Sequence, residues 1–457
     1  MYPFKKALIV TVLISSNLFL FGCGSSSDAT EDEDVITYED SYIQFYNAVP
    51  NSKSTAVTLI DSDETESYLG QVSYSRATGL NTIPANNEYV LSLSYLDDFG
   101  KEEVFNEQAI ELKEGQKMVA IFTGSYDNPD IVSVVYDRYD LEDEFRLYFT
   151  NVTSKTAQLE ILIADAGDTI DEASLIGDFN FGGVIESDKF DLAEYHFFIR
   201  NLDTGEVIFD SENITFNFST QYLIVLKDAF GPSQSKIAMD VIGNTSSVFE
   251  FDDLDSLAQF RAYNTIENLT SIDLSIDGST PLTIEGLTPL NMTEFQTVEF
   301  GDYQLNVTSQ DSEIVVDDSL LTLNQNESKT VIIYQDQNQI ISALDFTQYI
   351  IPSSYQHNVD IVNLIEDYED LDVYFVKSDE TIDTATEYAV GIDFTERYTR
   401  TLNSNLYTIL LVHENDNEQR KLLARLDDVA LGTTSGLVLI ADDADPSIGG
   451  YKLTLVE

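Results

Sequence analysis

Clusters of aspartate and glutamate are the residues of this chain whose types and spacing could do chemistry. Four such clusters fall in predicted loops: Asp61/Asp63/Glu64, Asp165/Asp168/Asp171/Glu172, Asp252/Asp253/Asp255 and Asp442/Asp443/Asp445. Calcium takes about six to eight hard oxygen ligands, which clustered loop carboxylates can supply. We therefore name two candidate calcium sites, one at Asp165, Asp168 and Asp171 and one at Asp442, Asp443 and Asp445. None of the clusters has the EF-hand spacing, and solvated acidic loops would account for the same residues.

Residues for catalysis are scarce. The three histidines, His196, His357 and His413, include no local pair that could begin a zinc site. The chain contains no G-x-S-x-G, H-E-x-x-H or P-loop motif. A glycosidase-type carboxylate pair could be drawn anywhere among 81 acidic residues, so none is assigned. Tryptophan is absent, but 25 tyrosines leave glycan binding open. We expect a protein that is not an enzyme.

The only cysteine, Cys23, ends the segment Leu20-Phe21-Gly22-Cys23. Lys5 and Lys6 come first, followed by a mostly apolar stretch from Ala7 to Phe21. A cationic start, a short apolar core and a small residue before the cut are typical of a secretory signal. A transmembrane helix would need roughly 20 apolar residues. With one cysteine, no intrachain disulfide can form.

This segment resembles a bacterial lipoprotein signal with its lipobox. The resemblance implies removal of residues 1–22 and diacylglycerol on the sulfur of Cys23. Gly24, rather than Asp, resembles lipoproteins sent to the outer membrane. We therefore expect a lipid-anchored protein of the bacterial cell envelope, on either the periplasmic or the surface face. Residues 23–41, which are mostly small, polar and acidic, would form a flexible tether.

The net charge of the chain is −58, and removal of Lys5 and Lys6 would make it −60. Such a surface repels nucleic acid and anionic lipid headgroups, so no nucleic acid is expected as a partner. Contact with the membrane would then depend on the acyl chains on Cys23. Cations, matrix polymers and basic patches of envelope proteins are the partners that this charge favours.

Internal repetition predicts the architecture. Strands that end in an asparagine recur about every 100 residues, at Asn47, Asn151, Asn264 and Asn363. Strands that open with a tyrosine recur with a similar period, at Tyr89, Tyr195, Tyr303 and Tyr407. Alternating apolar residues and Gly/Asn/Asp turns indicate six or seven short strands in each copy. We predict an all-β chain of about four tandem immunoglobulin-like β-sandwich repeats, over residues 42–140, 144–247, 258–350 and 357–457.

The repeated residues have structural explanations. Each asparagine stands where a strand enters a loop, and its amide can bond the local backbone. Each tyrosine is in phase with apolar residues, so its ring belongs in the core while its hydroxyl bonds a turn. The linkers are predicted at residues 137–144, 246–257 and 347–356, with a short helical turn over 252–257.

The repeats resemble the domain-of-unknown-function-4397 family of bacterial exported proteins. The resemblance rests on the four asparagines, on Ile272-Asp273-Leu274-Ser275-Ile276-Asp277-Gly278, on Leu371-Asp372-Val373-Tyr374 and on Ile83-Pro84-Ala85 ahead of Tyr89. It implies exported β-sandwich repeats and supplies no catalytic residues.

Three functions remain open from the sequence. The first is a non-catalytic, lipid-anchored envelope protein that presents tandem β-sandwiches for binding or adhesion. The second is an enzyme or accessory protein acting on envelope polysaccharide, which would need an inserted loop in one copy, with Asp165–Lys189 as the candidate. The third is a structural spacer.

Overall fold

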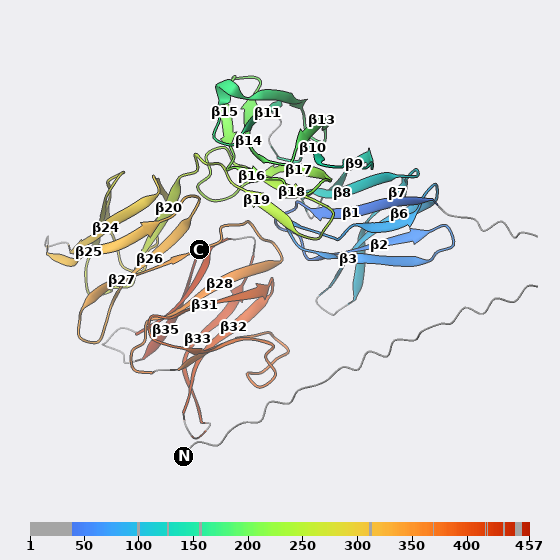
Figure 1. Ribbon diagram of the computed structural model, residues 1–457. Coiled ribbons are helices and arrows are strands. Elements are labelled where there is room, and N and C mark those ends of the chain that lie inside the picture. The colour runs from blue at the N-terminus through green and yellow to red at the C-terminus, as the bar shows by residue number, and fades with distance from the viewer. Residues whose placement is uncertain are drawn as a thin grey trace, which may run out of the picture. The chain divides into compact units, whose positions relative to one another are not determined.

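The computed structural model describes residues 39–97, 101–125, 128–154, 158–309, 313–368, 370–415, 417, 419–432, 435–443 and 450–457. Within these ranges the chain forms 35 β-strands and one short 3-10 turn, η1 (Ile170–Glu172). No helix in this part of the chain is long and apolar enough to cross a bilayer. The predicted signal, Cys23 and the tether up to residue 38 lie outside the described residues. The all-β prediction is confirmed (Figure 1).

The strands form four sandwiches of two sheets each. The first contains β1 (Asp40–Asn47), β2 (Thr55–Asp61), β3 (Glu66–Val72), β4 (Arg76–Ala77), β5 (Asn81–Pro84), β6 (Glu88–Leu96), β7 (Glu102–Glu111), β8 (Gln116–Ser125) and β9 (Asn128–Asp137). The second contains β10 (Glu144–Asn151), β11 (Leu159–Asp165), β12 (Ser174–Phe179), β13 (Val184–Asp191), β14 (Glu194–Asn201), β15 (Val207–Asp210), β16 (Ile214–Thr215), β17 (Gln221–Asp228), β18 (Ile237–Ile242) and β19 (Val248–Phe251).

The third and fourth sandwiches have eight strands each. The third contains β20 (Ala258–Asn264), β21 (Ile272–Asp277), β22 (Leu282–Leu287), β23 (Gln296–Val298), β24 (Gly301–Ser309), β25 (Ile314–Leu323), β26 (Ser328–Gln335) and β27 (Ile341–Thr347). The fourth contains β28 (Gln356–Asn363), β29 (Leu371–Val376), β30 (Glu387–Ile392), β31 (Arg397–Asn403), β32 (Leu406–Glu414), β33 (Arg420–Ala430), β34 (Leu437–Asp443) and β35 (Tyr451–Val456).

All four sandwiches share one topology. In the fourth, the two sheets have the orders β31-β28-β34-β35 and β30-β29-β32-β33, and in the third β23-β20-β26-β27 and β22-β21-β24-β25. The opening strand of every copy pairs in parallel with the first strand of the closing hairpin: β1 with β8, β10 with β17, β20 with β26 and β28 with β34. The other strand pairs described are antiparallel.

Each sandwich has its own core, built by strands that alternate between apolar and polar residues. In β21, Ile272, Leu274 and Ile276 are fully buried, whereas Asp273 and Ser275 between them are partly exposed. Each buried aliphatic side chain of this size contributes about 1.5–3 kcal/mol. Because the inward residues come from both sheets, one continuous apolar layer holds each repeat together.

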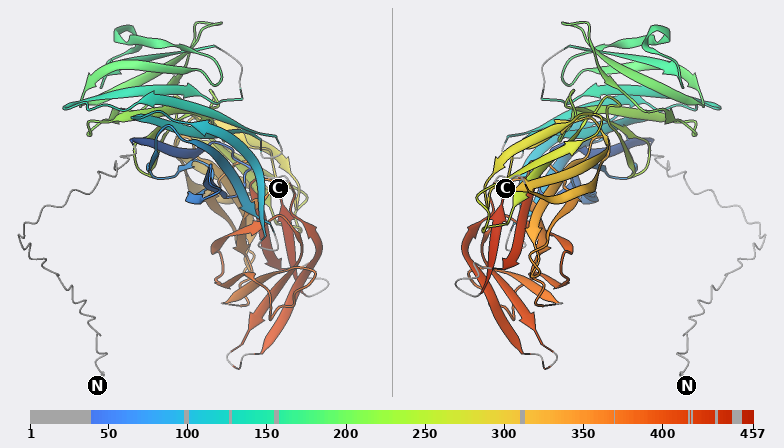
Figure 2. Two further views of the ribbon diagram at one scale, coloured as in Figure 1. Left: turned by 90° about the vertical axis from the view of Figure 1, so that its right-hand side faces the viewer. Right: turned by 90° about the vertical axis from the view of Figure 1, so that its left-hand side faces the viewer.

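The outer faces of certain sheets are apolar as well, and they join the sandwiches in pairs. A cluster of outward side chains from the first and second sandwiches comprises Tyr46, Ala77, Val119, Ile121, Val134, Tyr136, Tyr148, Val152, Leu223, Val225 and Ile242. A second cluster joins the third and fourth sandwiches and comprises Tyr263, Ile332, Phe346, Val362, Leu364, Val438 and Ile440. Strands β8 and β17 are therefore buried on both faces, as their long apolar runs require. Figure 2 shows the paired sandwiches from two further sides.

Some details of the sequence prediction were wrong. The second sandwich continues to Phe251 rather than ending at 247, because β19 pairs with β18. The first begins at Asp40 rather than 42, because Asp40 pairs with Pro84. The short helical turn predicted over 252–257 is a single hydrogen-bonded turn, in which the Ser256 N–H donates to the Asp253 carbonyl at 2.9 Å. Each sandwich has more than the six or seven predicted strands. The segment after its second strand forms two strands, one in each sheet, as β3 and β4 do in the first sandwich.

Candidate functional site

The four repeated asparagines shape the exit of each opening strand. The Oδ1 atoms of Asn47, Asn151, Asn264 and Asn363 accept the N–H two residues further on, at 2.9, 2.9, 2.9 and 2.8 Å. In the last two copies the amide Nδ2 also donates to the carbonyl of Leu287 (3.0 Å) or Ile392 (2.9 Å). The predicted turn-forming role is confirmed, and these residues are not a binding site.

The four repeated tyrosines play a matching structural role. Their rings are buried, and their hydroxyls donate to carbonyls of the preceding turn. The bonds run from Tyr89 to Pro84 (3.1 Å), Tyr195 to Asp191 (2.9 Å), Tyr303 to Glu299 (2.6 Å) and Tyr407 to Asn403 (2.8 Å). This is the tyrosine-corner arrangement of β-sandwiches, as predicted.

The acidic clusters do not converge on metal sites. No group of three Asp, Glu, His or Cys side chains in the described residues is placed to hold a metal ion. Asp165 and Asp171 are exposed, and Asp168 is partly exposed, along the turn from β11 into η1. The structure therefore does not support the calcium prediction at this cluster. A turn that spreads successive carboxylates toward solvent cannot surround one ion with them.

The cluster after β34 is different, because its first member is buried. Asp442 is 9 % exposed, and burial raises the pKa of its carboxyl to about 7. Its Oδ1 accepts the N–H of Asp443 at 2.8 Å. Asp443 is exposed, and Asp445 lies outside the described residues. Asp442 and Asp443 alone give no group of three metal-binding side chains among the described residues, so the calcium site at this cluster stays a prediction.

The histidines have structural partners. His196 bonds the Asp210 carboxylate and stacks on Phe198 with ring centroids 4.4 Å apart. His357 is buried, with its Nε2 2.8 Å from the Ser404 hydroxyl. His413 Nδ1 lies 3.1 Å from the carbonyl oxygen of Asp370. Although His196 has the carboxylate of a catalytic triad, neither this pair nor the other histidines are joined by hydrogen bonds into a complete triad.

The segment proposed as an inserted loop is ordinary β-structure. Between Asp165 and Lys189 the chain forms η1, β12 and most of β13, with the bridge from Asn151 to Phe181 at the turn. None of the five cavities described for this chain is lined by a residue of this segment. The observation that would have favoured an active site in the second copy is therefore missing from the described residues.

A cavity of about 540 Å³ is lined in part by acidic residues from the second and third sandwiches. Glu212, Asp252, Asp253 and Asp302 contribute to its wall. Burial raises the pKa of both Asp252 and Asp253. The Asp253 Oδ1 already accepts the N–H groups of Asp210 and Asp255, both at 3.2 Å. The third predicted acidic cluster therefore serves partly to shape its own turn.

An ion network lies in the interface of the first pair. Lys227 Nζ contacts Asp240 Oδ2 at 3.1 Å and also pairs with Glu250. From the first sandwich, the hydroxyls of Tyr46 and Ser75 both donate to Asp240. Burial alone would lower the pKa of Lys227, but the two carboxylates raise it above its ordinary value. Buried charges that satisfy one another in this way make the interface selective for one arrangement.

A second buried lysine lies in the same interface. Lys117 Nζ donates to the Gly243 carbonyl at 3.3 Å and to Asn244 Oδ1 at 3.0 Å, both in the second sandwich. It has no such carboxylate partner, and burial lowers its pKa to about 7. Sequence analysis missed these lysines. The available signal was a basic residue inside an apolar strand, in a chain with only 23 basic residues.

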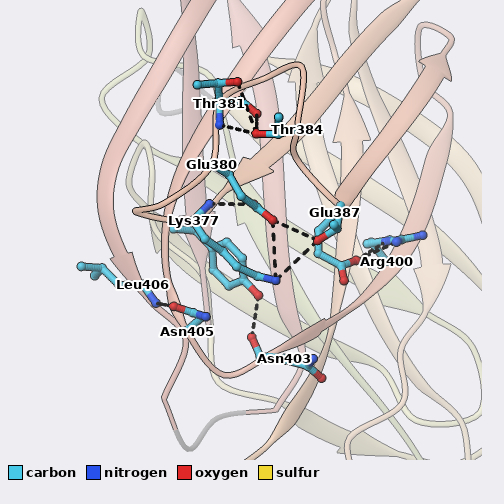
Figure 3. A network of polar contacts seen from close by, with 11 residues as sticks. Lys377, Glu380, Thr381, Thr384, Glu387, Arg400, Asn403, Asn405 and Leu406 are labelled. Carbon is cyan, nitrogen blue, oxygen red and sulfur yellow. Dashed lines mark hydrogen bonds and ion pairs between the residues drawn. The ribbon is translucent and has the colours of Figure 1, made fainter. Parts of the chain in front are cut away.

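In the fourth sandwich, the loop between β29 and β30 folds back on the outer face of its sheet. Ile382 and Ala385 pack there against a cluster made by Tyr374, Val376 and Val412. Figure 3 shows the polar contacts that hold this loop. Glu380 accepts the N–H of Lys377 at 3.1 Å and the hydroxyl of Thr386 at 3.2 Å. Arg400 donates to Glu387 at 2.6 and 3.0 Å. These polar groups stabilise the loop and bond one another.

Comparisons with known proteins name no family. No protein-family model matches the chain, and no curated protein matches it. Among solved structures, the Bacillus anthracis TIE protein has 7% identity and a TM-score of 0.15, over 89% of this chain and 68% of that one. A putative adhesin from Bacteroides ovatus has 11% identity and a TM-score of 0.15, over 47% and 96%. BcpA, the major pilin subunit of Bacillus cereus, has 8% identity and a TM-score of 0.14, over 88% and 99%. At these TM-scores the similarities carry no argument, so the proposed function rests on the geometry of this chain alone.

Proposed function

We propose that this chain is a non-catalytic, lipid-anchored protein of the bacterial cell envelope that presents paired β-sandwiches for binding or adhesion. The observation that carries the proposal is the packing of sheet against sheet within each pair. It joins two sandwiches into one unit and leaves loop tips and strand edges as the surfaces that can meet a partner.

Rigid pairing suits presentation rather than chemistry. Inter-domain motion is the default when a linker alone connects two domains, but a large apolar interface suppresses it. Here each pair shares a cluster of aromatic and aliphatic side chains, and the first pair also has the buried ions at Lys227 and Asp240. A surface built from two sandwiches therefore keeps its shape, which lowers the entropic cost of binding.

The lipid anchor and the location in the cell envelope are part of the proposal. Cys23 supplies the attachment, and its lipobox resemblance supplies the expected location in the outer membrane. Anionic lipid headgroups would repel a chain with a net charge of −58. This charge therefore supports a role for the sandwiches away from the lipid surface. The resemblance of the repeats to the domain-of-unknown-function-4397 family stays a prediction.

Two measurements test the proposed function. Protease shaving of intact cells asks whether the sandwiches are on the surface, where we expect their complete loss. Purified full-length protein is then tested for binding to immobilised matrix polymers and envelope proteins, beside an acidic control protein of similar net charge. Retention above that control supports a binding role. Failure to bind any member of either class would contradict it and would leave the structural spacer as the function.

A further inference from the structure

One cavity combines an uncharged lining with aromatic side chains, in an otherwise acidic molecule. It measures about 220 Å³ and is lined by loops of the first sandwich, by the linker after β27 and by the outer face of the β28 sheet. None of its fourteen lining residues is Asp, Glu, Lys or Arg. Such residues are 23% of the chain, so about three would be expected by composition.

The floor of this groove is an uncovered stretch of the β28 sheet. Outward residues of β28 alternate with core residues such as Val359, and the third sandwich covers only one end of this row. Gln348 Nε2 donates to Asp360 Oδ2 at 3.1 Å, at the edge of the area that the third sandwich covers. The exposed residues Gln356 and Asn358 lie beyond it. The floor therefore consists of amides, set on a rigid strand.

A neighbouring strand completes this floor and orients it. Thr401 on β31 lies opposite Asn358. Its hydroxyl donates to Asn358 Oδ1 at 2.8 Å, so the amide oxygen is occupied by a protein donor. That bond fixes the amide plane, and the Nδ2 group is the side of Asn358 suited to donate to a ligand.

Two tyrosines supply aromatic walls. Tyr349 is 77 % exposed, which is unusual for a large ring and leaves its faces accessible. Tyr74 is held in place by the second sandwich, since its hydroxyl reaches the Asp228 carbonyl at 3.4 Å. Its ring packs edge-on against Phe230, with centroids 6.4 Å apart, and Lys227 Nζ lies 4.8 Å from the ring centroid, so one of its two faces already meets an ammonium group. A bond of 3.3 Å from Asn51 Nδ2 to Ser354 Oγ joins the first sandwich to the linker beside the groove.

We propose that this groove binds a neutral oligosaccharide, an inference that rests on the proposed binding function and names its ligand class. Aromatic faces accept the C–H faces of a sugar ring, and amides and hydroxyls match its hydroxyl groups as donors and acceptors. A cationic ligand would find no carboxylate in this lining, and an anionic one would be repelled by the chain's charge. Uncharged polar groups beside aromatic rings therefore favour a neutral, hydroxyl-rich ligand.

The adjoining cavity sharpens the assignment. It measures about 420 Å³ and shares Tyr74, Tyr349 and Ile351 with the groove. Its lining also includes five charged residues, Lys227, Asp228, Glu250, Asp252 and Glu327. Because the two cavities share both tyrosines, the absence of charge distinguishes the groove over the β28 sheet from the cavity beside it.

The test uses the full-length protein in detergent, with isothermal titration calorimetry. The probes are maltohexaose, laminarihexaose, cellohexaose and mannohexaose, with hexamers of glucosamine and galacturonate as charged comparisons. We expect at least one neutral hexaose to bind and neither charged hexamer to do so. Tyr349→Ala and Asn358→Ala should each weaken binding by about tenfold. Tyr349→Phe, which keeps the ring, should bind nearly as the unaltered protein does.

The matched control is Tyr68→Ala, which removes a similarly exposed tyrosine (64 %) from β3, outside the groove. It should leave the affinity unchanged, and thermal unfolding of every variant shows that the fold is kept. Neutral-sugar binding that survives Tyr349→Ala and Asn358→Ala would overturn the groove as the site. Binding of charged hexamers alone, or of no sugar while a protein partner is retained, would overturn the ligand class and leave the proposed function standing.

Discussion

The Lys227 ammonium and the Asp240 carboxylate lie 3.1 Å apart in the interface of the first two sandwiches, with their side chains 2 % and 0 % exposed. Two hydroxyls from the first sandwich also donate to Asp240 Oδ2, whereas its buried Oδ1 has no hydrogen-bond partner among the described residues. The pair therefore couples the stability of one sandwich to the presence of the other.

Replacing one member of this pair should be costly. Lys227→Met leaves two carboxylates without their cation, and we expect a loss of about 3–5 kcal/mol in the free energy of unfolding, measured in urea. The double variant Lys227→Met/Asp240→Asn should lose less than the sum of the single changes. Arg425→Ala is the control, because its ion pair with Asp427 is about half exposed on both sides and should cost at most about 1 kcal/mol. Equal losses at the two sites would contradict a buried ion network.

Lys117 predicts a dependence of stability on pH. Its pKa in the folded protein is about 7, below the ordinary value of 10.5. Between these values the unfolded chain binds the proton and the folded chain does not, so stability rises with pH by up to about 1.4 kcal/mol per unit. Below pH 7 Lys117 is protonated in both the folded and the unfolded chain, so its contribution to stability no longer changes with pH. The buried charge then destabilises the fold by its full amount. Lys117→Met should reduce the gain in stability between pH 7 and pH 9, and identical slopes in the two proteins would refute the assignment.

Asp442 predicts the opposite slope. Burial raises its pKa from about 3.8 to about 7, so between these values the folded chain holds a proton that the unfolded chain releases. Stability should therefore fall as pH rises from about 4 to 7. The charges of Asp443 and Glu267 also raise the pKa of Asp442, whereas the Lys452 ammonium lowers it. Asp442→Asn should stabilise the protein at pH 8 by a few kcal/mol and change little at pH 4. Unfolding curves at the two pH values, with the exposed Asp203→Asn in the second sandwich as control, decide the matter.

The asparagine turns can be tested one at a time. Asn264→Ala removes two hydrogen bonds at a fully buried position, so we expect a loss of about 1–3 kcal/mol. The exposed Asn268 is a suitable comparison, because its amide donates to the side chain of Gln335, which is only partly buried. Urea unfolding of the two alanine variants should separate them clearly, and a negligible effect of Asn264→Ala would remove the structural role.

The proposed anchor makes a prediction about location. Cys23→Ser cannot carry diacylglycerol, so we expect the protein to leave the membrane fraction and to lose incorporation of radiolabelled palmitate. Ser25→Ala, two residues away, should behave as the unaltered protein does. A Cys23→Ser protein that still sediments with outer membranes at high salt would show that something other than the acyl chains holds it.

Local sequence patterns predicted much of this fold. Alternation around Ile272 and Leu371, the asparagine exits and the tyrosine corners all involve residues close together along the chain, where spacing alone specifies face and turn. Local patterns could not predict the pairing of sandwiches, because it depends on contacts between outward residues that are far apart in sequence, such as Ile121 and Val225. Acidic clusters misled for the opposite reason: proximity along the chain does not make side chains converge. The groove beside Tyr349 combines five separate stretches of sequence, so no single motif predicts it.

The parallel pairing of β1 with β8 also dictates an order of events while the chain is being made. Tyr42 pairs with Lys117, so the opening strand waits for a partner that emerges some 75 residues later. Contacts of such long range form slowly. The bond from Tyr46 to Asp240 spans 194 residues, so the interface of the pair can close only after the second sandwich has been synthesised. Until then the apolar outer face of the first sandwich is open to water, and the growing chain is at its most prone to aggregate during that interval.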